Sequence, residues 1–381
     1  MSDNVTHIPG AKRKKLKTRL IALSGVVLLV AALAALYFFR VAPDTGEETQ
    51  SVSGTVEEAF SFDAHSSNRY AAFDGGLAVA SASGLSVYAP DGAERCIVQT
   101  SMTTPTIQTC TDTVLAYDAG GYSLITVGKK GNKLLELTAA KPILDADLSP
   151  DGFVCDSTSE SGYKSVLYVY NANGTMIYRW LSSSQYLPVC TVSKGGSYLA
   201  AIALGQANGI FESRLVVFRT DSEEIYSTVP LGNELYYDLE FLEDGTLCAV
   251  GESSVMWLRM DGTLLGKYDY NGTYLKDFSF GGNGFLTLSL NMYKAGNRCT
   301  VVTVDAAGTE LGSVFYTEEI LDSAAAGDFV AVLTANGLDL YDRNMEPSAK
   351  LDSTQGATAV TVRADGSALL LSGGTGRKFT P

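Results

Sequence analysis

From residue 57 to the C-terminus the chain repeats one arrangement of apolar and polar positions. A short apolar stretch ends in a glycine-containing turn, a second apolar run follows, and a segment rich in Val, Leu and Tyr leads through another polar turn to a last apolar segment. The clearest copies are 144–152 leading to 166–170, and 237–245 leading to 255–258. Short apolar runs between such turns are typical of β-strands, so each repeat predicts four strands.

The spacing of the repeats predicts a β-propeller. The first residue of each predicted second strand serves as an anchor, and successive anchors lie 37 to 48 residues apart. The anchors are Leu77, Val114, Phe153, Tyr198, Thr246, Phe285, Phe329 and Ala368. Repeats of about 40–45 residues with four strands each are typical of propeller blades. We therefore expect an all-β fold of eight four-stranded blades, with seven as the alternative if a terminal repeat is irregular.

The last repeat lacks a fourth strand. After the run at 368–371, only 375–379 remains, which suffices for a third strand. The segment Glu58–Phe62 alternates like a strand and precedes the first full repeat. If it completes the last blade, the ring closes and leaves no open sheet edge.

A hydrophobic segment precedes the repeats. Residues 20–39 form an unbroken uncharged run with six basic residues before it. A helix of that length spans roughly 30 Å, the thickness of a bilayer core, and the flanking charges place the N-terminus in the cytoplasm. A cleaved signal peptide and a buried helix are the alternatives. The expected layout is a cytoplasmic tail (1–19), a transmembrane helix (20–39), an acidic linker (40–56) and an extracytoplasmic propeller (57–381), with the protein in the cell membrane.

The charge of the chain is unevenly distributed. Of 28 basic and 42 acidic residues, residues 41–381 contain 21 and 41, a net charge of about −20. Such an acidic domain repels nucleic acid, so nucleic acid is disfavoured and is not an expected partner.

Four carboxylates recur at one position of the predicted first strands. They are Asp145, Asp238, Asp277 and Asp322. Because first strands line the channel of a propeller, these residues could gather at its mouth and bind a cation or a basic partner, or act as acid–base pairs on a glycan. Alternatively, each aspartate accepts backbone hydrogen bonds where the chain enters a blade. The calcium-like segment Asp145-Ala-Asp147 continues with Ser149 and Pro150, which does not fit an EF-hand, and we predict no metal site and no cofactor.

Other candidate groups are less specific. Only His7 and His65 are histidines, which excludes a histidine-rich metal site and any Ser-His-Asp triad not built on His65. Six cysteines lie in apolar strands, where buried free thiols are expected, and Cys155 with Cys190 in the next repeat is the pair that could form a disulfide. Six tyrosines of the fifth and sixth repeats could form a peptide- or sugar-binding face: Tyr236, Tyr237, Tyr268, Tyr270, Tyr274 and Tyr293.

The turn sequence Leu-Ser-Pro-Asp-Gly at 148–152 resembles the turns of WD40-like, TolB-like and quinoprotein-like propellers. The Gly-His and Trp-Asp dipeptides of WD40 repeats are absent, and Trp180 and Trp257 are the only tryptophans, which argues against a quinone-dependent enzyme. The whole layout is similar to the membrane-anchored propellers of Gram-positive anaerobes in domain-of-unknown-function family 5711. That resemblance implies a fold and a location, without catalytic residues or a substrate.

These observations favour a non-enzymatic binding or scaffolding module at the outer face of the membrane. Its expected partner is a protein or a cell-wall polymer that contacts the loops of one propeller face. The alternative is an extracytoplasmic enzyme that acts on glycans through the channel aspartates. A third possibility is a sensor that signals through residues 1–19.

Overall fold

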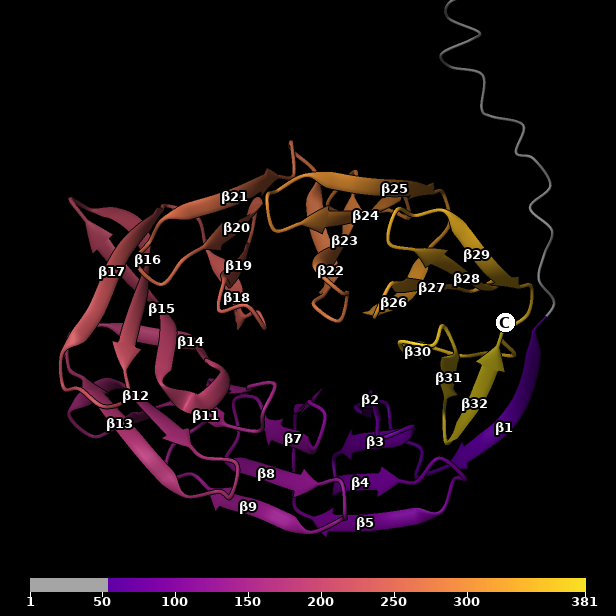
Figure 1. The fold of residues 1–381 in the computed structure, drawn as a ribbon, viewed down its shortest axis with the longest axis horizontal. Helices are drawn as coiled ribbons and strands as arrows, with labels where there is room; N and C mark the ends of the chain where they lie inside the picture. Colours follow the sequence, from indigo (N-terminus) through magenta and orange to yellow (C-terminus); the bar gives the residue numbers. More distant parts are fainter. Residues whose placement is uncertain (1–53) are drawn as a thin grey trace, which may run out of the picture. The chain divides into compact units, whose positions relative to one another are not determined.

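Residues 54–381, the part of the chain that the computed structural model describes, form a ring of eight four-stranded antiparallel sheets (Figure 1). The predicted eight-bladed propeller is confirmed, and the seven-bladed alternative is wrong. Each of the eight anchors lies within one residue of the start of a second strand. The predicted tail, transmembrane helix and nearly all of the linker lie outside the described residues. Within 54–381, no helix is long and apolar enough to cross a membrane.

The strands of each blade follow one another from the channel outward. Blade 1 contains β2 (Arg69–Phe73), β3 (Gly76–Ser81), β4 (Gly84–Tyr88) and β5 (Glu94–Gln99). Blade 2 contains β6 (Pro105–Thr109), β7 (Thr113–Asp118), β8 (Ser123–Gly128) and β9 (Lys133–Thr138). Blade 3 contains β10 (Asp145–Leu148), β11 (Val154–Glu160), β12 (Tyr163–Tyr170) and β13 (Met176–Ser182). Blade 4 contains β14 (Tyr186–Val192), a 3₁₀ turn (Lys194–Gly196), β15 (Tyr198–Ala207), β16 (Ile210–Arg219) and β17 (Ile225–Gly232).

The second half of the ring repeats this order. Blade 5 contains β18 (Tyr236–Phe241), β19 (Leu247–Gly251), β20 (Ser254–Leu258) and β21 (Leu264–Asp269). Blade 6 contains β22 (Tyr274–Ser279), β23 (Phe285–Asn291), β24 (Cys299–Asp305) and β25 (Glu310–Tyr316). Blade 7 contains β26 (Ile320–Ala326), β27 (Phe329–Thr334), β28 (Leu338–Asp342) and β29 (Pro347–Leu351). Blade 8 contains β30 (Ala359–Val362), β31 (Ala368–Ser372), β32 (Thr375–Thr380) and β1 (Thr55–Ser61).

The N-terminal strand closes the ring, as predicted. Strand β1 pairs antiparallel with β32, from Thr55 opposite Thr380 to Ser61 opposite Thr375, with an irregularity between Glu58 and Phe60. The pairing begins three residues before the predicted segment 58–62. All eight sheets are complete within residues 54–381, so this part of the chain contains everything needed for a closed propeller.

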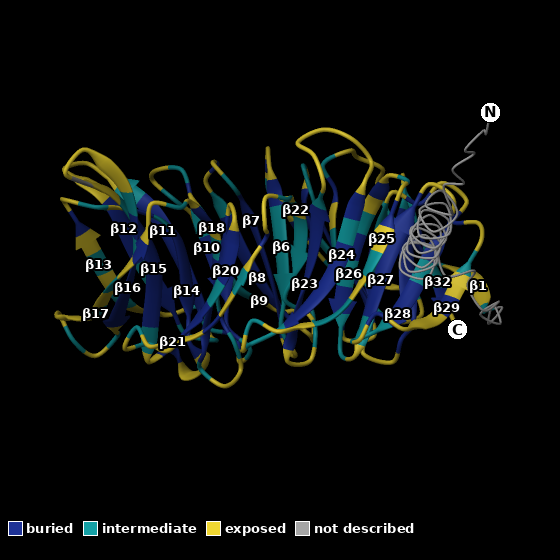
Figure 2. Cartoon of the chain, turned by 90° about the horizontal axis from the view of Figure 1, so that it is seen from above, coloured by how far each residue is buried: buried dark blue, intermediate teal, exposed yellow. Residues whose placement is uncertain are grey.

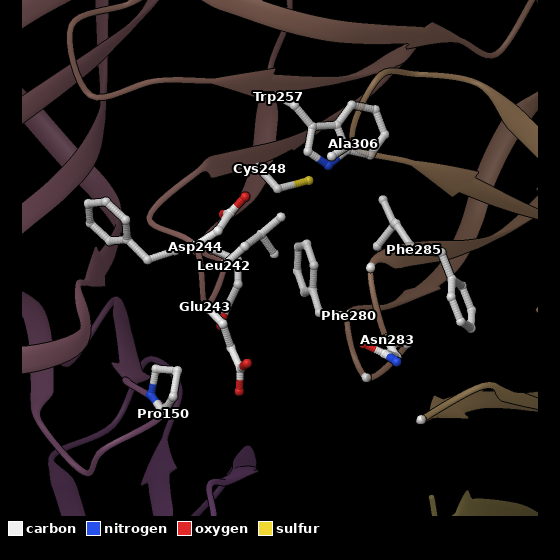
Figure 3. Close-up of a pocket in the computed structure, with 17 residues that line it drawn as sticks. Pro150, Leu242, Glu243, Asp244, Cys248, Trp257, Phe280, Asn283, Phe285 and Ala306 are labelled. Atoms are coloured by element: carbon white, nitrogen blue, oxygen red, sulfur yellow. The ribbon is translucent and has the colours of Figure 1, made fainter.

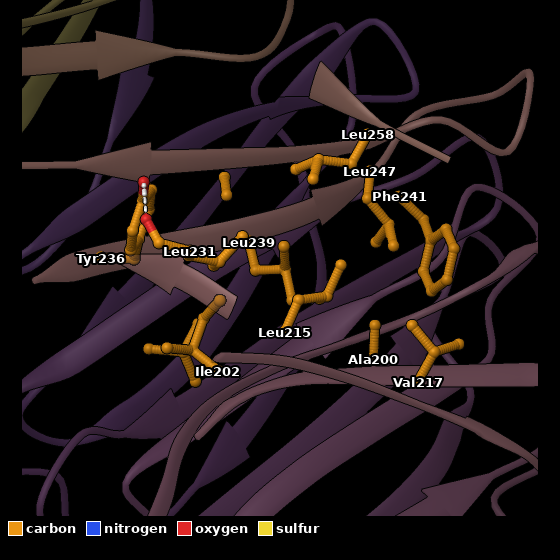
Figure 4. Close-up of a cluster of buried hydrophobic side chains, with 12 residues drawn as sticks. Ala200, Ile202, Leu215, Val217, Leu231, Tyr236, Leu239, Phe241, Leu247 and Leu258 are labelled. Atoms are coloured by element: carbon orange, nitrogen blue, oxygen red, sulfur yellow. Dashed lines mark hydrogen bonds between the residues drawn. The ribbon is translucent and has the colours of Figure 1, made fainter. Parts of the chain in front are cut away.

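The hydrophobic core lies between the blades. The second and third strands are buried on both faces, because each sheet packs against two neighbours, and burial decreases toward the outer strands (Figure 2). One such cluster joins blades 4 and 5, where Leu215 and Val217 pack against Leu239 and Leu247 (Figure 4). Burial of such side chains contributes roughly 1.5–3 kcal/mol each.

The ring has two different faces. The connection face carries the links between blades and the loops that join second to third strands. The turn face carries the short turns that join first to second and third to fourth strands. Glycines at positive φ, such as Gly92 and Gly262, occupy these turns as predicted. Strand β1 starts at the turn face, because it is the outermost strand of blade 8 and leads on to blade 1, and the C-terminus lies at the same face (Figure 2).

Candidate functional sites on the two faces of the propeller

The four predicted aspartates lie on inner strands around the channel. Asp145 begins β10, and Asp238, Asp277 and Asp322 lie on β18, β22 and β26. All four side chains are partly buried. The structure therefore places them at equivalent positions of four blades, as the repeat pattern predicts.

Three of the four aspartates hold the next blade in place. The bonds run from Cys190 N to Asp145 Oδ2 (2.9 Å), from Ser323 Oγ to Asp277 Oδ2 (2.8 Å) and from Val360 N to Asp322 Oδ2 (2.8 Å). Asp238 accepts a bond only from the backbone N–H of its own neighbour, Leu239 (2.8 Å). These contacts favour a structural interpretation for Asp145, Asp277 and Asp322, because their carboxylates satisfy buried donors of the adjacent sheet.

Burial raises the pKa of each of these carboxyl groups. The pKa of Asp322 rises to about 6, because burial and nearby Asp277 outweigh its bond to Val360 and the attraction of Arg69. Burial, and then the charge of Asp145, raise the pKa of Asp238 well above its usual range. Ionising the carboxyl groups that line the channel therefore requires more free energy than ionising exposed ones.

Two more carboxyl groups extend this cluster. Asp147 accepts bonds from Thr191 Oγ (2.8 Å) and Val192 N (3.3 Å) in blade 4, and burial raises its pKa to about 6. Burial, followed by the charge of Asp147, raises the pKa of Glu240 well above its usual range. The two carboxyl groups therefore each raise the free-energy cost of ionising the other. No three His, Cys, Asp or Glu side chains of residues 54–381 are arranged to hold a metal ion.

The junction of blades 5 and 6 differs from its neighbours. At the other junctions between blade 2 and blade 8, a side chain on the inner strand of one blade forms a hydrogen bond with the inner strand of the next blade. In the described residues, no such bond joins β18 of blade 5 to β22 of blade 6. The β22–β23 turn instead leans on blade 7, where Asn283 N donates to Gly327 O (2.7 Å). Glycine is required at 281, because a Cβ there would lie 1.9 Å from Ala325 O. The turn therefore stands away from blade 5.

A pocket of about 530 Å³ fills this junction at the turn face (Figure 3). Its inner wall contains Trp257, Cys248 and Leu286, and Phe280 lines the side formed by blade 6. Three carboxyl groups, from Glu240, Glu243 and Asp244, also line the pocket, and no Lys or Arg does. The repeat pattern does not predict this pocket, because the pocket depends on which neighbouring blade the β22–β23 turn contacts.

The predicted tyrosine face is only partly formed. Tyr236 and Tyr270 are buried in the core and cannot contact a ligand. Tyr268 bonds Glu310 on the outer strand of blade 6 (3.0 Å). Tyr237, Tyr274 and Tyr293 are exposed, and all three lie at the connection face.

Exposed apolar side chains extend across the connection face from blade 2 to blade 7. They include residues of the second-to-third-strand loops and of the starts of first strands: Tyr122, Leu144, Tyr163, Tyr186, Ile210, Phe211, Leu235, Tyr237, Tyr274, Met292, Tyr293 and Leu321. The other large apolar side chains that are exposed in residues 54–381 lie on outer strands at the rim of the ring, and none lies in a turn of the turn face. The two faces therefore differ sharply in character.

The cysteines are free thiols in residues 54–381. Four are buried, whereas Cys96 and Cys110 are partly exposed. The pair that the sequence singles out does come together: Cys155 Sγ lies 3.5 Å from Cys190 Sγ between blades 3 and 4. His65 is exposed and bonds Ser67 through Nδ1 (2.7 Å).

The closed ring places the protein among the eight-bladed β-propellers. Its sequence matches the model of a family of unknown function, DUF5711, over residues 48–370, and the chain belongs to that family. None of the curated protein sequences compared with this chain matches it.

Several solved propellers share the fold. The C-terminal WD40 domain of Sif2 is 12% identical, with a TM-score of 0.60 over 86% of this chain and 98% of that one. The quinohemoprotein alcohol dehydrogenase ADHIIG from Pseudomonas putida HK5 is 11% identical, with a TM-score of 0.55 over 87% and 76%. BamB from Moraxella catarrhalis is 13% identical, with a TM-score of 0.50 over 87% and 99%. At these identities the likeness concerns the fold alone.

Proposed function

We propose that this protein is a non-enzymatic binding or scaffolding module that docks a protein partner on its connection face. In this proposal residues 20–39 anchor the chain in the cell membrane, with the N-terminus cytoplasmic and the propeller outside. The uneven distribution of exposed apolar side chains carries the proposal. Large apolar patches on a soluble surface mark interaction sites, and the turn face provides a comparison within the same molecule.

The composition of the connection face favours a protein over a polymer. Sugars stack on aromatic rings, which Tyr237, Tyr274 and Tyr293 could provide. The face also exposes Ile210, at 62%, and Met292, at 40%, and aliphatic side chains of this kind pack against other apolar side chains. Aromatic residues and Met are enriched in the cores of protein interfaces. A cell-wall polymer bound by the tyrosines remains the second candidate.

The position of the N-terminal strand is compatible with such docking. Strand β1 begins at the turn face, on the side of the ring opposite the connection face. Residues 54–381 contain 21 basic and 38 acidic residues, a net charge of −17. An acidic domain is repelled by anionic lipid, which supports a propeller that is held off the membrane with its connection face free.

The enzyme alternative has less support. The aspartates that it needs are largely occupied, because three of them hold an adjacent blade. Asp238 and Glu240 remain on blade 5, and burial raises the pKa of both carboxyl groups. The Cys248 thiol lines the same pocket as Glu240, but burial raises its pKa well above the usual range, which makes it a poor nucleophile.

Photo-crosslinking in the full-length protein tests the docking face. A photoreactive amino acid replaces Tyr237, which is 48% exposed, or Ile210 at the connection face. Matched controls carry it at Ile97 or Phe315, each 48% exposed on outer strands. We expect a discrete protein adduct from the first two positions only. Once the adduct is identified, Ile210→Ala with Phe211→Ala should weaken binding of the purified partner about tenfold or more.

Other outcomes contradict the proposal or change the identity of the partner. Equal adducts from all four positions would indicate non-specific contact, and no adduct from any position would indicate an unused face. An adduct of twice the mass of the chain would make the partner a second copy. An adduct that contains glycan would make it the polymer.

A further inference from the structure

The pocket between blades 5 and 6 lies on the turn face, away from the proposed docking face. One polar group of its lining is the indole N–H of Trp257. This side chain is only 2% exposed, and its indole nitrogen lies on the pocket side (Figure 3). Among residues 54–381 this N–H finds no hydrogen-bond acceptor. The nitrogen is not among the fully enclosed unpaired polar atoms of residues 54–381, so it is reached from the pocket, and a ligand that fills the pocket can supply its acceptor.

The rest of the lining specifies a cation. Glu243 and Asp244 stand exposed at the rim, Glu240 closes the channel side, and no basic residue lines the pocket to neutralise them. The aromatic rings of Trp257 and Phe280 form the walls. A cation can lie against such rings, and an aliphatic stem can cover them. Phe285, at the blade 6 end of the pocket, already has the Arg343 guanidinium 5.8 Å from its ring centroid.

We propose that this pocket binds an arginine or lysine residue within a peptide segment. The basic group would lie between Glu243 and Asp244, the stem against Phe280 and Trp257, and a peptide carbonyl would accept the Trp257 N–H. Arginine fits best, because its planar fork bonds carboxylates in pairs and stacks on aromatic rings. The volume of about 530 Å³ is in the range of ligand pockets and exceeds what one side chain fills, which leaves room for the adjoining backbone.

Tryptophan fluorescence of residues 54–381 provides the test, since this part of the chain contains the complete ring. Trp180→Phe leaves Trp257 as the sole tryptophan. The probes are N-acetyl-arginine methylamide and its uncharged isostere, N-acetyl-citrulline methylamide. We expect a saturable change in Trp257 emission with the arginine probe, with a Kd on the order of 1 mM, and binding of the citrulline probe about tenfold weaker.

Matched variants separate the site from the overall acidity. Glu243→Gln should weaken the arginine probe about threefold to tenfold. Glu223→Gln removes a charge that is likewise exposed, from a turn of blade 4 on the same face, and should leave binding unchanged. Equal binding of both probes, equal loss in both variants, or no saturation at about 50 mM probe, some fifty times the expected Kd, would overturn the proposal. Both variants keep all core residues, so unchanged thermal unfolding confirms that they fold.

Discussion

Asp156 is an unusual residue to find inside this propeller. It lies on β11, is 1% exposed, and neither of its carboxyl oxygens makes a hydrogen bond of normal geometry in the described structure. Burial raises its pKa to about 7, the nearby charge of Asp145 adds to the shift, and the Tyr170 hydroxyl offsets part of it. Near pH 8 the protein must therefore hold an ionised carboxylate in its core.

The sign and size of the effect follow from proton linkage. The folded state retains the Asp156 proton up to about pH 7, whereas the unfolded chain loses it near pH 4. Stability should therefore fall as the pH rises between these values, and should be highest at the acidic end. A pKa that rises from 3.8 to about 7 corresponds to about 4 kcal/mol. For about 330 residues this amounts to a Tm difference of about 6 °C.

Asp156→Asn removes this titration and keeps the shape of the side chain. The assay is the Tm of residues 54–381 at pH 5 and pH 8, for the wild type and the variant. The wild type should lose about 4 °C more than the variant between the two pH values, because the unfolded chain has already lost most of its Asp156 proton at pH 5 and only about 2.6 kcal/mol of the effect remains above it. The cost of burying the amide of the Asp156→Asn variant is the same at both pH values, so it does not affect this difference between the two Tm shifts. Asp328→Asn, at an exposed position, removes the same charge and should behave like the wild type.

Parallel pH profiles of the wild type and Asp156→Asn would refute the reasoning. They would mean that the Asp156 carboxyl group has the same pKa in the folded and unfolded states. A wild type that gains stability on going from pH 5 to pH 8, relative to the variant, would reverse the sign and show that the ionised form is the stabilised one.

Three further predictions concern the packing of the blades. At pH 5, Asp322→Ala should lower the Tm by about 2–4 °C, because an N–H of the next blade loses its acceptor. Asp238→Ala should lower the Tm less, because Asp238 does not bond the next blade. Equal shifts in Tm would contradict this difference between the two aspartates. Phe60→Ala empties a buried site in β1 and should cost about 3–5 kcal/mol in denaturant unfolding; a loss below about 1 kcal/mol would show that closure does not depend on this strand. Refolding with oxidised glutathione should join Cys155 to Cys190, with the oxidant reduced to two thiols. The folded protein should react with oxidised glutathione far more slowly, since burial raises the pKa of Cys155 to about 12. Titration of the remaining thiols after unfolding measures how much disulfide has formed in each case. An equally fast reaction of the folded protein would contradict this prediction.

The sequence predicts this fold well because the determinants are local. Alternating strands, Gly-containing turns and a regular spacing lie within each repeat, so the anchors locate every second strand. Even the closing segment at 58–62 is recognisable, since the last repeat lacks a strand and the first is preceded by a spare one. The predicted start of this strand is three residues too late, because Thr55 and Val56 belong to a polar stretch whose pairing with β32 depends on the closed ring.

The sites are harder to predict because they depend on contacts between repeats. Tyr236 and Tyr237 are adjacent in sequence, yet one is buried and the other exposed, since successive strand residues face opposite sides. Nothing local distinguishes Asp238 from Asp322, although only the second bonds the next blade. The environments of Asp156 and Trp257 are created by neighbouring blades, which the spacing of repeats does not describe.

Closure by β1 also determines the order of folding. The ribosome makes this strand first, but its partner β32 appears more than 300 residues later. Until then blade 8 cannot form, and the growing arc of blades keeps a free edge at each end, where another chain could pair. Such distant pairing is slow, so we expect the last step of folding to be the joining of the two termini. A chain released before its final residues are made would leave β1 without a partner.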